Sequence, residues 1–231
     1  LLPPETRRVF GLAGKSPTFL KNIVANPLYQ AVCDKMLTSE NKSWLGQNLE
    51  TSISRPQLNN TVVLSISPGA RAQELHRDDM IHHNPLTAIT ADQYKIGRDT
   101  GIGWFVAGKK TTKANGATRF IPGSHLWDQM EPPNEDLAFF AELNPGDGFM
   151  MLSSCFHGGS ANTTADQERL VYSCFMTKGY LRQVSSFSDR KKTSTWRPHS
   201  RKSASTTMLI CRNSLGTRSA TRFGAGWTWM I

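Results

Sequence analysis

Long apolar segments, paired cysteines and internal repeats are all missing from this 231-residue sequence. No apolar run approaches the about 18–20 residues that a helix needs to cross a bilayer. The first residues, LLPPETRR, lack the charged and apolar regions of a signal peptide; they also lack Met, so a fragment boundary with N-terminal truncation is one interpretation of the start. The four cysteines form no CxxC pair, which argues against a zinc ribbon, a redox dithiol and a disulfide scaffold. We expect one globular domain in the cytoplasm, with no membrane partner.

Acidic residues are nearly absent from the C-terminal part of the chain. Residues 183–231 contain nine Lys or Arg and a single acid, Asp189, so they carry +8 of the net charge of +9. Residues 1–182 are therefore almost neutral, and we expect no nucleic-acid partner for the main body. A basic nucleic-acid-binding protein is an alternative that depends on the tail alone. It predicts salt-dependent DNA binding that is lost when residues 184–231 are deleted.

The sequence has three zones. Residues 1–55 are expected to be mostly helix and loop, because apolar residues recur near helical period, with an interruption at Pro27. The recurring positions are Phe19, Ile23, Val24, Leu28, Val32 and Leu37. Residues 56–182 contain short β-branched and aromatic runs separated by Gly and Pro, which predicts an antiparallel barrel or jelly roll. Residues 184–231 are rich in Ser, Thr, Lys and Arg without apolar period, which predicts disorder. The domain is accordingly predicted to span residues 1–183.

The segment ELHRDDMIHH, residues 74–83, gathers histidines and aspartates after the predicted strand VVLSIS. Alternate residues of a strand point to the same side, so His76 and Asp78 can share a metal ion while Asp79 points away. Two His and one carboxylate on one octahedral face are typical of Fe(II) in oxygen-activating enzymes. A polar loop with exposed His and Asp is the alternative, since H-x-D by itself is a weak signal.

A third ligand must come from farther along the chain, where His125, His157 and His199 are the candidates. His157 is favoured because it ends the apolar run FMMLSSCF, where a strand end can face a barrel interior. Twelve residues later, Arg169 opens the run RLVYSCFM. An arginine suits the distal carboxylate of 2-oxoglutarate, because its planar guanidinium binds a carboxylate through two hydrogen bonds; a surface charge is the alternative for Arg169.

Four motifs in this order, QELHRDD, NGATRFIPGSH, HGGSANTT and the following Arg, resemble the phytanoyl-CoA dioxygenase family. The chain is most similar to its fungal secondary-metabolite branch, which includes a fumitremorgin B endoperoxidase and meroterpenoid-tailoring dioxygenases, over residues 10–183. The resemblance implies a double-stranded β-helix (a jelly roll or cupin-like barrel) with flanking helices. It also implies Fe(II) bound by His76, Asp78 and His157, and 2-oxoglutarate bound by Arg169.

The same resemblance implies further contacts to 2-oxoglutarate from Gln73 and Thr112. The alternatives are an exposed turn residue for Gln73 and an ordinary strand threonine for Thr112. His82 and His83 are expected either to line the substrate entrance or to be exposed loop residues, and His125 is not expected to be a ligand. By this resemblance the protein would oxidise a small apolar metabolite, such as a terpenoid, meroterpenoid or alkaloid, with O2. Hydroxylation, desaturation, rearrangement and endoperoxidation are open outcomes, as is a homodimer, whereas Asp78 argues against a halogenase.

Two departures from the family pattern stand out. The run AGKKTTKANGAT carries Lys109, Lys110 and Lys113 where the family usually has an acidic residue. The tail, residues 184–231, replaces an expected closing motif, and shifting its codons by one base can restore residues of that motif. A frameshifted or mis-spliced tail is therefore our hypothesis, which sequencing of the transcript tests. An inactive jelly-roll relic of the family is the second interpretation of the whole chain.

Overall fold

The computed structural model describes residues 5–183. The predictions for residues 184–231, a disordered or frameshifted tail and its nucleic-acid alternative, lie outside the described residues, as does His199. The boundary at residue 183 and the cytoplasmic localisation stay predictions. Between residues 5 and 183, every helix is too short or too polar to cross a bilayer.

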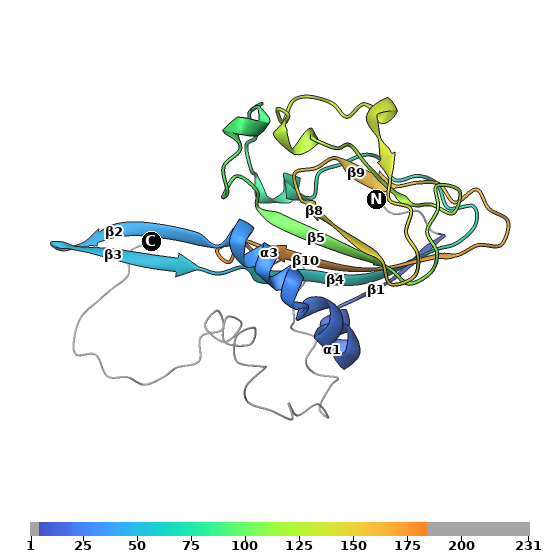
Figure 1. The fold of residues 1–231 in the computed structure, drawn as a ribbon, viewed down its shortest axis with the longest axis horizontal. Helices are drawn as coiled ribbons and strands as arrows, with labels where there is room; N and C mark the ends of the chain where they lie inside the picture. Colours follow the sequence, from blue (N-terminus) through green and yellow to red (C-terminus); the bar gives the residue numbers. More distant parts are fainter. Residues whose placement is uncertain (1–4, 184–231) are drawn as a thin grey trace. The chain divides into compact units, whose positions relative to one another are not determined.

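Residues 5–183 form three sheets, and the largest, here the larger sheet, has five antiparallel strands (Figure 1). Their order is β1 (Thr6–Phe10), β4 (Gln57–Ile66), β10 (Arg169–Thr177), β5 (Gly101–Ala107) and β8 (Gly148–Leu152). Alternate side chains of a strand face opposite sides of the sheet. In β10, Val171 therefore packs into one buried cluster with Ile66 and Phe105, while Cys174 packs into another with Tyr29. Both faces of this sheet are covered over its inner strands, which explains why β5, β8 and β10 consist largely of apolar residues, whereas the edge strand β1 is mostly exposed.

A second sheet of three short strands consists of β7 (Phe139–Phe140), β6 (Thr118–Phe120) and β9 (His157–Gly159). Four 3-10 turns lie in the connections: η2 (Asp78–His82), η3 (Ala91–Gln93), η4 (Ser124–Leu126) and η5 (Glu135–Leu137). One cavity is lined both by strands β4, β5 and β10 of the larger sheet and by β6 and β9 of the smaller one. The two sheets therefore enclose a common interior, as predicted for a jelly roll.

Helical segments cover the other face of the larger sheet (Figure 1): α1 (Leu12–Lys15), α2 (Pro17–Phe19), the π-helical turn η1 (Leu20–Val24) and α3 (Pro27–Leu37). The predicted break at Pro27 is the start of α3, where the Asn26 side chain accepts hydrogen bonds from the first turn. The buried positions of α3 are Tyr29, Cys33 and Leu37. The predicted apolar face was wrong at Leu28, which is 67% exposed, because that side chain lies one position away from this stripe.

The prediction of helix and loop for residues 1–55 was wrong in two places. Residues 6–10 form β1 at the edge of the larger sheet, and β2 (Ser39–Leu45) pairs with β3 (Asn48–Ser54) as a separate hairpin. Its two-residue turn begins with Gly46 at φ +61°, a conformation that favours glycine. Nearly every residue of this hairpin is exposed, so no buried face imposes the alternation by which a strand is recognised.

A β-bulge interrupts the pairing of β4 with β10. Phe175 lies opposite Asn60 and Met176 lies opposite Leu58, so Asn59 is an extra residue in β4. Bulges bend a strand locally and redirect its side chains, and they are common beside active sites. Both Asn59 and Asn60 line a cavity next to the predicted metal ligands.

Candidate metal centre and adjoining cavities

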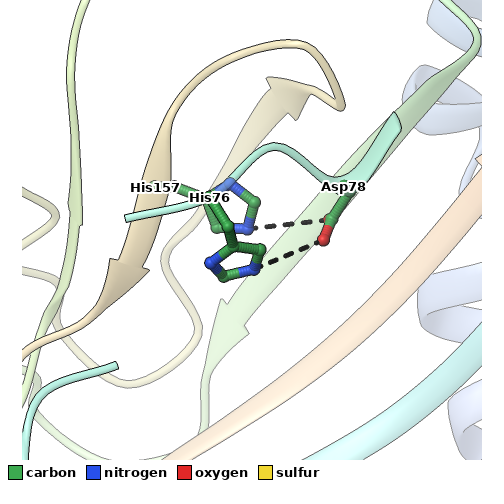
Figure 2. A group of neighbouring side chains, drawn as sticks. All are labelled: His76, Asp78 and His157. Atoms are coloured by element: carbon green, nitrogen blue, oxygen red, sulfur yellow. Dashed lines mark ion pairs between the residues drawn. The ribbon is translucent and has the colours of Figure 1, made fainter. Parts of the chain in front are cut away.

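His76 and His157 are held opposite each other by a backbone bridge. The N–H of each residue donates a 2.9 Å hydrogen bond to the carbonyl of the other, and the two ring centroids lie 4.5 Å apart. His157 is the first residue of β9, whereas His76 belongs to the connection that follows β4. Two segments eighty residues apart thus place their imidazoles on the same side (Figure 2).

Asp78 completes the cluster from the same connection as His76. The intervening Arg77 is extended, with φ −107° and ψ 134°, so its neighbours on both sides project the same way. The expected continuous strand is not formed, because Asp78 already begins η2; one extended residue is enough to produce the alternation. Asp79 points away, as predicted, and its carboxylate accepts a hydrogen bond from Asn84.

The donor atoms of His76, Asp78 and His157 converge on one point (Figure 2), all within 4.8 Å of one another. One carboxylate oxygen of Asp78 lies 3.6 Å from Nε2 of His76 and the other 3.6 Å from Nε2 of His157. These separations are longer than a hydrogen bond between a nitrogen and an oxygen atom. They approach the spacing of about 3 Å between two ligands that bind one metal at right angles with bonds of about 2.1 Å. The residues fit a metal ion held by two His and one carboxylate.

Backbone carbonyls prepare both imidazoles for such a metal. Nδ1 of His76 lies 2.9 Å from the Glu74 carbonyl, and Nδ1 of His157 lies 3.1 Å from the Cys155 carbonyl. A carbonyl only accepts, so each Nδ1 carries the proton and each Nε2 presents its lone pair to the cluster. The tautomer and ring orientation that metal binding needs are therefore set by the protein.

Burial and charge act in opposite directions on these groups. Burial lowers the pKa of His157, which stays neutral. For His76, burial works against the imidazolium, but the neighbouring Asp78 carboxylate outweighs it and raises the pKa. Burial also works against the Asp78 carboxylate, and the two histidines outweigh it and lower the pKa. With both imidazoles deprotonated at Nε2, the cluster offers one carboxylate and two imidazole nitrogens, which are the ligands of a divalent cation.

A cavity of about 180 Å³, here called the first cavity, lies beside this cluster and contains the predicted cosubstrate arginine. Arg169 is only 3% exposed and donates a 2.7 Å hydrogen bond from Nη2 to Oγ1 of Thr118, while its Nε finds no partner in the described part of the chain. Burial lowers the pKa of Arg169 to about 10. A buried cation with one neutral partner is costly unless an anion joins it, so the first cavity is suited to a carboxylate.

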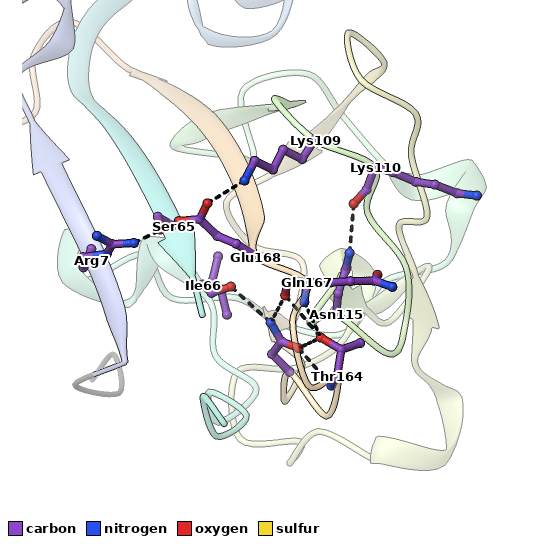
Figure 3. A network of polar contacts seen from close by, with 10 residues as sticks. Arg7, Ser65, Ile66, Lys109, Lys110, Asn115, Thr164, Gln167 and Glu168 are labelled. Carbon is purple, nitrogen blue, oxygen red and sulfur yellow. Dashed lines mark hydrogen bonds and ion pairs between the residues drawn. The ribbon is translucent and has the colours of Figure 1, made fainter. Parts of the chain in front are cut away.

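Arg169 is positioned by a polar network at the start of β10 (Figure 3). The preceding Glu168 accepts a 2.6 Å hydrogen bond from Lys109, and it also contacts Arg7 and Ser65. These contacts tie β10 to β1, to β4 and to the segment after β5. Lys109 is one of the lysines that depart from the family pattern, and here it serves as the partner of Glu168. Lys113 lies over the ring of Phe140 instead, 4.5 Å from its centroid.

Gln73 and Thr112, the two other residues predicted to contact 2-oxoglutarate, lie in different surroundings. Gln73 lines the first cavity, with Nε2 3.5 Å from Nε2 of His76 and Oε1 accepting a 3.4 Å hydrogen bond from the Gly159 N–H. Thr112 is not among the residues that line either cavity described here. It closes a turn with Asn115 through reciprocal hydrogen bonds between side chains and backbone. The structure thus brings Gln73, and not Thr112, to the metal cluster and Arg169.

Several cavity residues were missed from the sequence. Thr118 binds Arg169, and the buried Ser160 has a hydroxyl without a partner beside the same space. A second cavity, of about 210 Å³, adjoins the cluster and includes Asn60 and His82. Thr118 and Ser160 lie within the quoted NGAT and HGGS motifs, so their position beside ligand-bearing segments was a usable signal. Nothing in the sequence marks Asn60, because a bulge directs it to the site.

The other histidines of the described segment have separate surroundings. His82 is half-buried and lines the second cavity, whereas His83 is exposed, with a left-handed φ of 51°. The entrance role considered for both residues therefore finds support at His82 alone. His125 lies in η4 with its ring 5.7 Å from that of Tyr94 and is not part of the metal cluster.

Solved structures with the same fold confirm the predicted jelly roll with flanking helices. HygX from Streptomyces hygroscopicus, solved with nickel, 2-oxoglutarate and hygromycin B, matches with a TM-score of 0.54 at 16% identity, over 78% of this chain and 73% of that one. The 2-oxoglutarate-dependent epimerase SnoN from nogalamycin biosynthesis matches with a TM-score of 0.54 at 18% identity, over 84% of this chain and 72% of that one. At these identities the likeness concerns the fold.

Sequence comparison gives the family. Dioxygenase peniF of Penicillium patulum is 49% identical over 180 residues, which are 78% of this chain and 58% of that protein. Dioxygenase himG of Aspergillus japonicus is 46% identical over 180 residues, which are 78% of this chain and 56% of that protein. The chain thus spans little more than half the length of these relatives. Residues 5–171 match the family model of phytanoyl-CoA dioxygenase, and the chain belongs to that family.

Proposed function

We propose that this chain contains the catalytic centre of an Fe(II)- and 2-oxoglutarate-dependent dioxygenase that oxidises a small, largely apolar metabolite. The observation that carries the proposal is the junction of two features. Three metal-ligand atoms lie within 4.8 Å of one another, and the adjoining cavity contains a buried guanidinium that has no anionic partner among residues 5–183. The names of the curated relatives agree with an oxygenase, and the sequence resemblance supports a secondary metabolite as the substrate.

His76, Asp78 and His157 would hold the iron, which in this family supplies oxygen-dependent oxidation of a C–H bond coupled to decarboxylation of 2-oxoglutarate. Three protein ligands leave the remaining positions of an octahedral ion open. The residues of the chain do the binding and positioning. Asp78 would neutralise part of the charge of the ion, and the carbonyls of Glu74 and Cys155 hold the two imidazoles in the ligand tautomer.

Arg169 would bind the distal carboxylate of 2-oxoglutarate, assisted by the hydroxyl groups of Thr118 and Ser160. Gln73 would contact the end of the cosubstrate next to the metal, because its amide lies beside His76. A direct role of Thr112 receives no support from its contacts. Phe105, whose ring centroid lies 6.2 Å from that of His157, lines the same cavity and helps to exclude water.

Thermal unfolding of the full chain with Mn(II) and 2-oxoglutarate tests the proposal without requiring the substrate. Both ligands bind the native state, so the midpoint should rise with Mn(II) and rise further with 2-oxoglutarate. Asp78→Ala should abolish both increments, while Asp166→Ala, which removes an exposed carboxylate, should keep them. Succinate formation with Fe(II) and O2 then reports turnover.

An inactive relic of the family is the competing interpretation. It predicts a chain whose midpoint does not change at saturating Mn(II) and 2-oxoglutarate, and that outcome would reject the proposed function. Protection without succinate would leave the binding site in place and reject catalysis by this chain alone.

A further inference from the structure

The second cavity approaches the metal cluster from a different side. It shares His76, Asp78, Asn60 and Phe175 with the first cavity, and Arg169 lines only the first. The cluster therefore lies where the two cavities meet. If the first cavity takes 2-oxoglutarate, the second remains for the molecule that is oxidised, and its lining should reveal the chemistry of that molecule.

Unpaired polar atoms are concentrated around these two cavities. Among residues 5–183, six residues carry a buried polar side-chain atom without a hydrogen-bond partner, and five of them line one cavity or both; the exception is Ser173. Each such atom costs about 1–3 kcal/mol in a folded protein. Such a cost is expected to be offset where a ligand supplies the missing partner. Asn60, Arg77 and His82 are the members of this set that line the second cavity. The guanidinium of Arg77 already donates hydrogen bonds to the carbonyls of Ser124 and Asp128, which leaves Asn60 and His82 as the candidates for a ligand contact.

Asn60 offers an acceptor. Its Oδ1 is buried without a partner, and an amide oxygen can only accept a hydrogen bond. The bulge in β4 brings Asn60 to the junction of the cavities, opposite Phe175 of β10. A ligand that satisfies this atom must carry a hydroxyl or an N–H group.

His82 offers a second polar contact. Its Nδ1 lies 3.0 Å from Oγ1 of Thr100, which holds the ring, and its Nε2 is buried without a partner. Burial lowers the pKa of His82, so the imidazole is neutral at physiological pH and Nε2 donates or accepts according to the tautomer. A hydroxyl group satisfies either tautomer.

The rest of the second cavity is largely apolar. Met80, Ile81, Phe175 and Met176 contribute to it, and Met80 and Ile81 are 70% and 52% exposed. Large apolar side chains at the mouth of a cavity beside two fixed polar atoms are typical of a site for a mostly apolar small molecule.

We propose that the second cavity binds the substrate, and that Asn60 and His82 select an apolar molecule that carries a hydroxyl or N–H group. This inference rests on the proposed function and adds the substrate chemistry to it. Asn60 and His82 act as positioning residues, because a hydrogen bond at this distance from the metal decides which carbon of the substrate faces it.

A matched pair of probes tests the inference without knowledge of the natural substrate. The alcohol 2-indanol carries the hydroxyl, and 2-fluoroindane has nearly the same shape without a donor. With Mn(II) and 2-oxoglutarate bound under nitrogen, relaxation of the probe protons by the paramagnetic metal reports both binding and location. Zn(II) in place of Mn(II) gives the diamagnetic reference. We expect 2-indanol to bind about threefold to tenfold more tightly than 2-fluoroindane, the effect of one or two neutral hydrogen bonds.

Variants assign the effect to the two residues. Asn60→Leu and His82→Phe should each reduce the preference for the alcohol, the double variant should remove it, and each should change the affinity for 2-fluoroindane by less than about twofold. His82→Gln should keep much of the preference, because an amide can replace the ring nitrogen. His83→Asn is the control, since it alters a neighbouring exposed histidine and suits its left-handed backbone.

The rise in the thermal unfolding midpoint with Mn(II) and 2-oxoglutarate, here called protection, is measured first on every variant. Loss of folding or of the metal site is then recognised before any probe is added. Should Asn60→Leu not fold, the comparison of His82→Phe with His82→Gln decides. Equal binding of the two probes to the unaltered protein, or a parallel loss of both in the variants, would overturn the inference while leaving the proposed function intact. Absence of the protection itself counts against the proposed function.

Discussion

Replacing Arg169 with Met should stabilise the protein without ligands and at the same time abolish its response to 2-oxoglutarate. Burial lowers the pKa of Arg169 to about 10, which corresponds to about 3 kcal/mol of unfavourable free energy for the charged side chain at neutral pH. Both the folded and the unfolded protein are protonated here below pH 10, so this cost is constant around pH 7. Loss of the 2.7 Å hydrogen bond to Thr118 offsets about 1–2 kcal/mol of the gain.

We therefore expect Arg169→Met to raise the free energy of unfolding by about 1–2 kcal/mol in urea titrations without ligands. In the unaltered protein, 2-oxoglutarate at a hundred times its Kd should add about 2.7 kcal/mol. For a chain of this length that is about 5–11 °C in Tm, and the variant should show almost none of it. Arg8→Met, which removes an exposed arginine, controls for net charge. A variant that is less stable without ligands and still responds fully to 2-oxoglutarate would refute the role assigned to the buried cation.

Three further outcomes follow from particular contacts. A Cβ on Gly158 would lie 2.8 Å from the Gln73 carbonyl, so Gly158→Ala should weaken Mn(II) binding about tenfold to a hundredfold in calorimetry. A Cβ on Gly159 meets open space, so Gly159→Ala should leave Mn(II) binding unchanged. Equal Mn(II) affinities of the two variants would contradict the role of the close contact at Gly158. Tyr29→Phe removes a buried hydroxyl that lies 2.8 and 2.9 Å from two backbone carbonyl oxygens. The free energy of unfolding in urea should fall by about 1–3 kcal/mol, and an unchanged value would argue against these hydrogen bonds. Lys109 and Ser65 lower the pKa of Glu168 to about 2, so Glu168→Gln should reduce stability by at most about 1 kcal/mol at pH 7. That difference should fade as the pH falls from about 4.5 towards 2, and a difference independent of pH would contradict the ion pair.

The strands of the larger sheet were predictable because burial imposes a pattern on them. The runs that form β4, β5 and β10 contain β-branched or aromatic residues and are followed within two residues by Gly or Pro, as the sequence indicated, whereas the apolar run of β8 ends before Ser153. The hairpin of β2 and β3 was not predictable by the same means. Both of its faces are exposed to solvent, so nothing requires apolar and polar residues to alternate along its strands. In α3, the positions chosen from the sequence missed Tyr29 and Cys33, the side chains that pack on the sheet, because the choice favoured aliphatic residues.

At the site, spacing selected residues whose type is restricted by metal and carboxylate binding, and it missed polar residues that lie there by position. The structure brings His76, Asp78 and His157 together and places Arg169 in the adjoining cavity, while their roles stay predictions. Asn60 is an ordinary polar residue that a bulge brings to the site, and a bulge is not visible in one sequence, whereas Thr118 lies within the quoted NGAT motif and could have been considered. Thr112 shows the opposite case, in which a motif position carried over from the family serves a turn in this chain.

The spacing of the site residues also has a structural cause. His157 opens β9 in the smaller sheet and Arg169 opens β10 in the larger one, so the chain between them consists of the rest of β9 and the nine-residue connection, 160–168, that crosses from one sheet to the other. His76 reaches the same place through its bridge to His157, and Asn60 reaches it through the pairing of β4 with β10. The metal cluster, the buried cation and the two cavities therefore form only when both sheets have assembled. Ligands that bind there should consequently stabilise the whole jelly roll in one cooperative unfolding transition, and not one sheet alone.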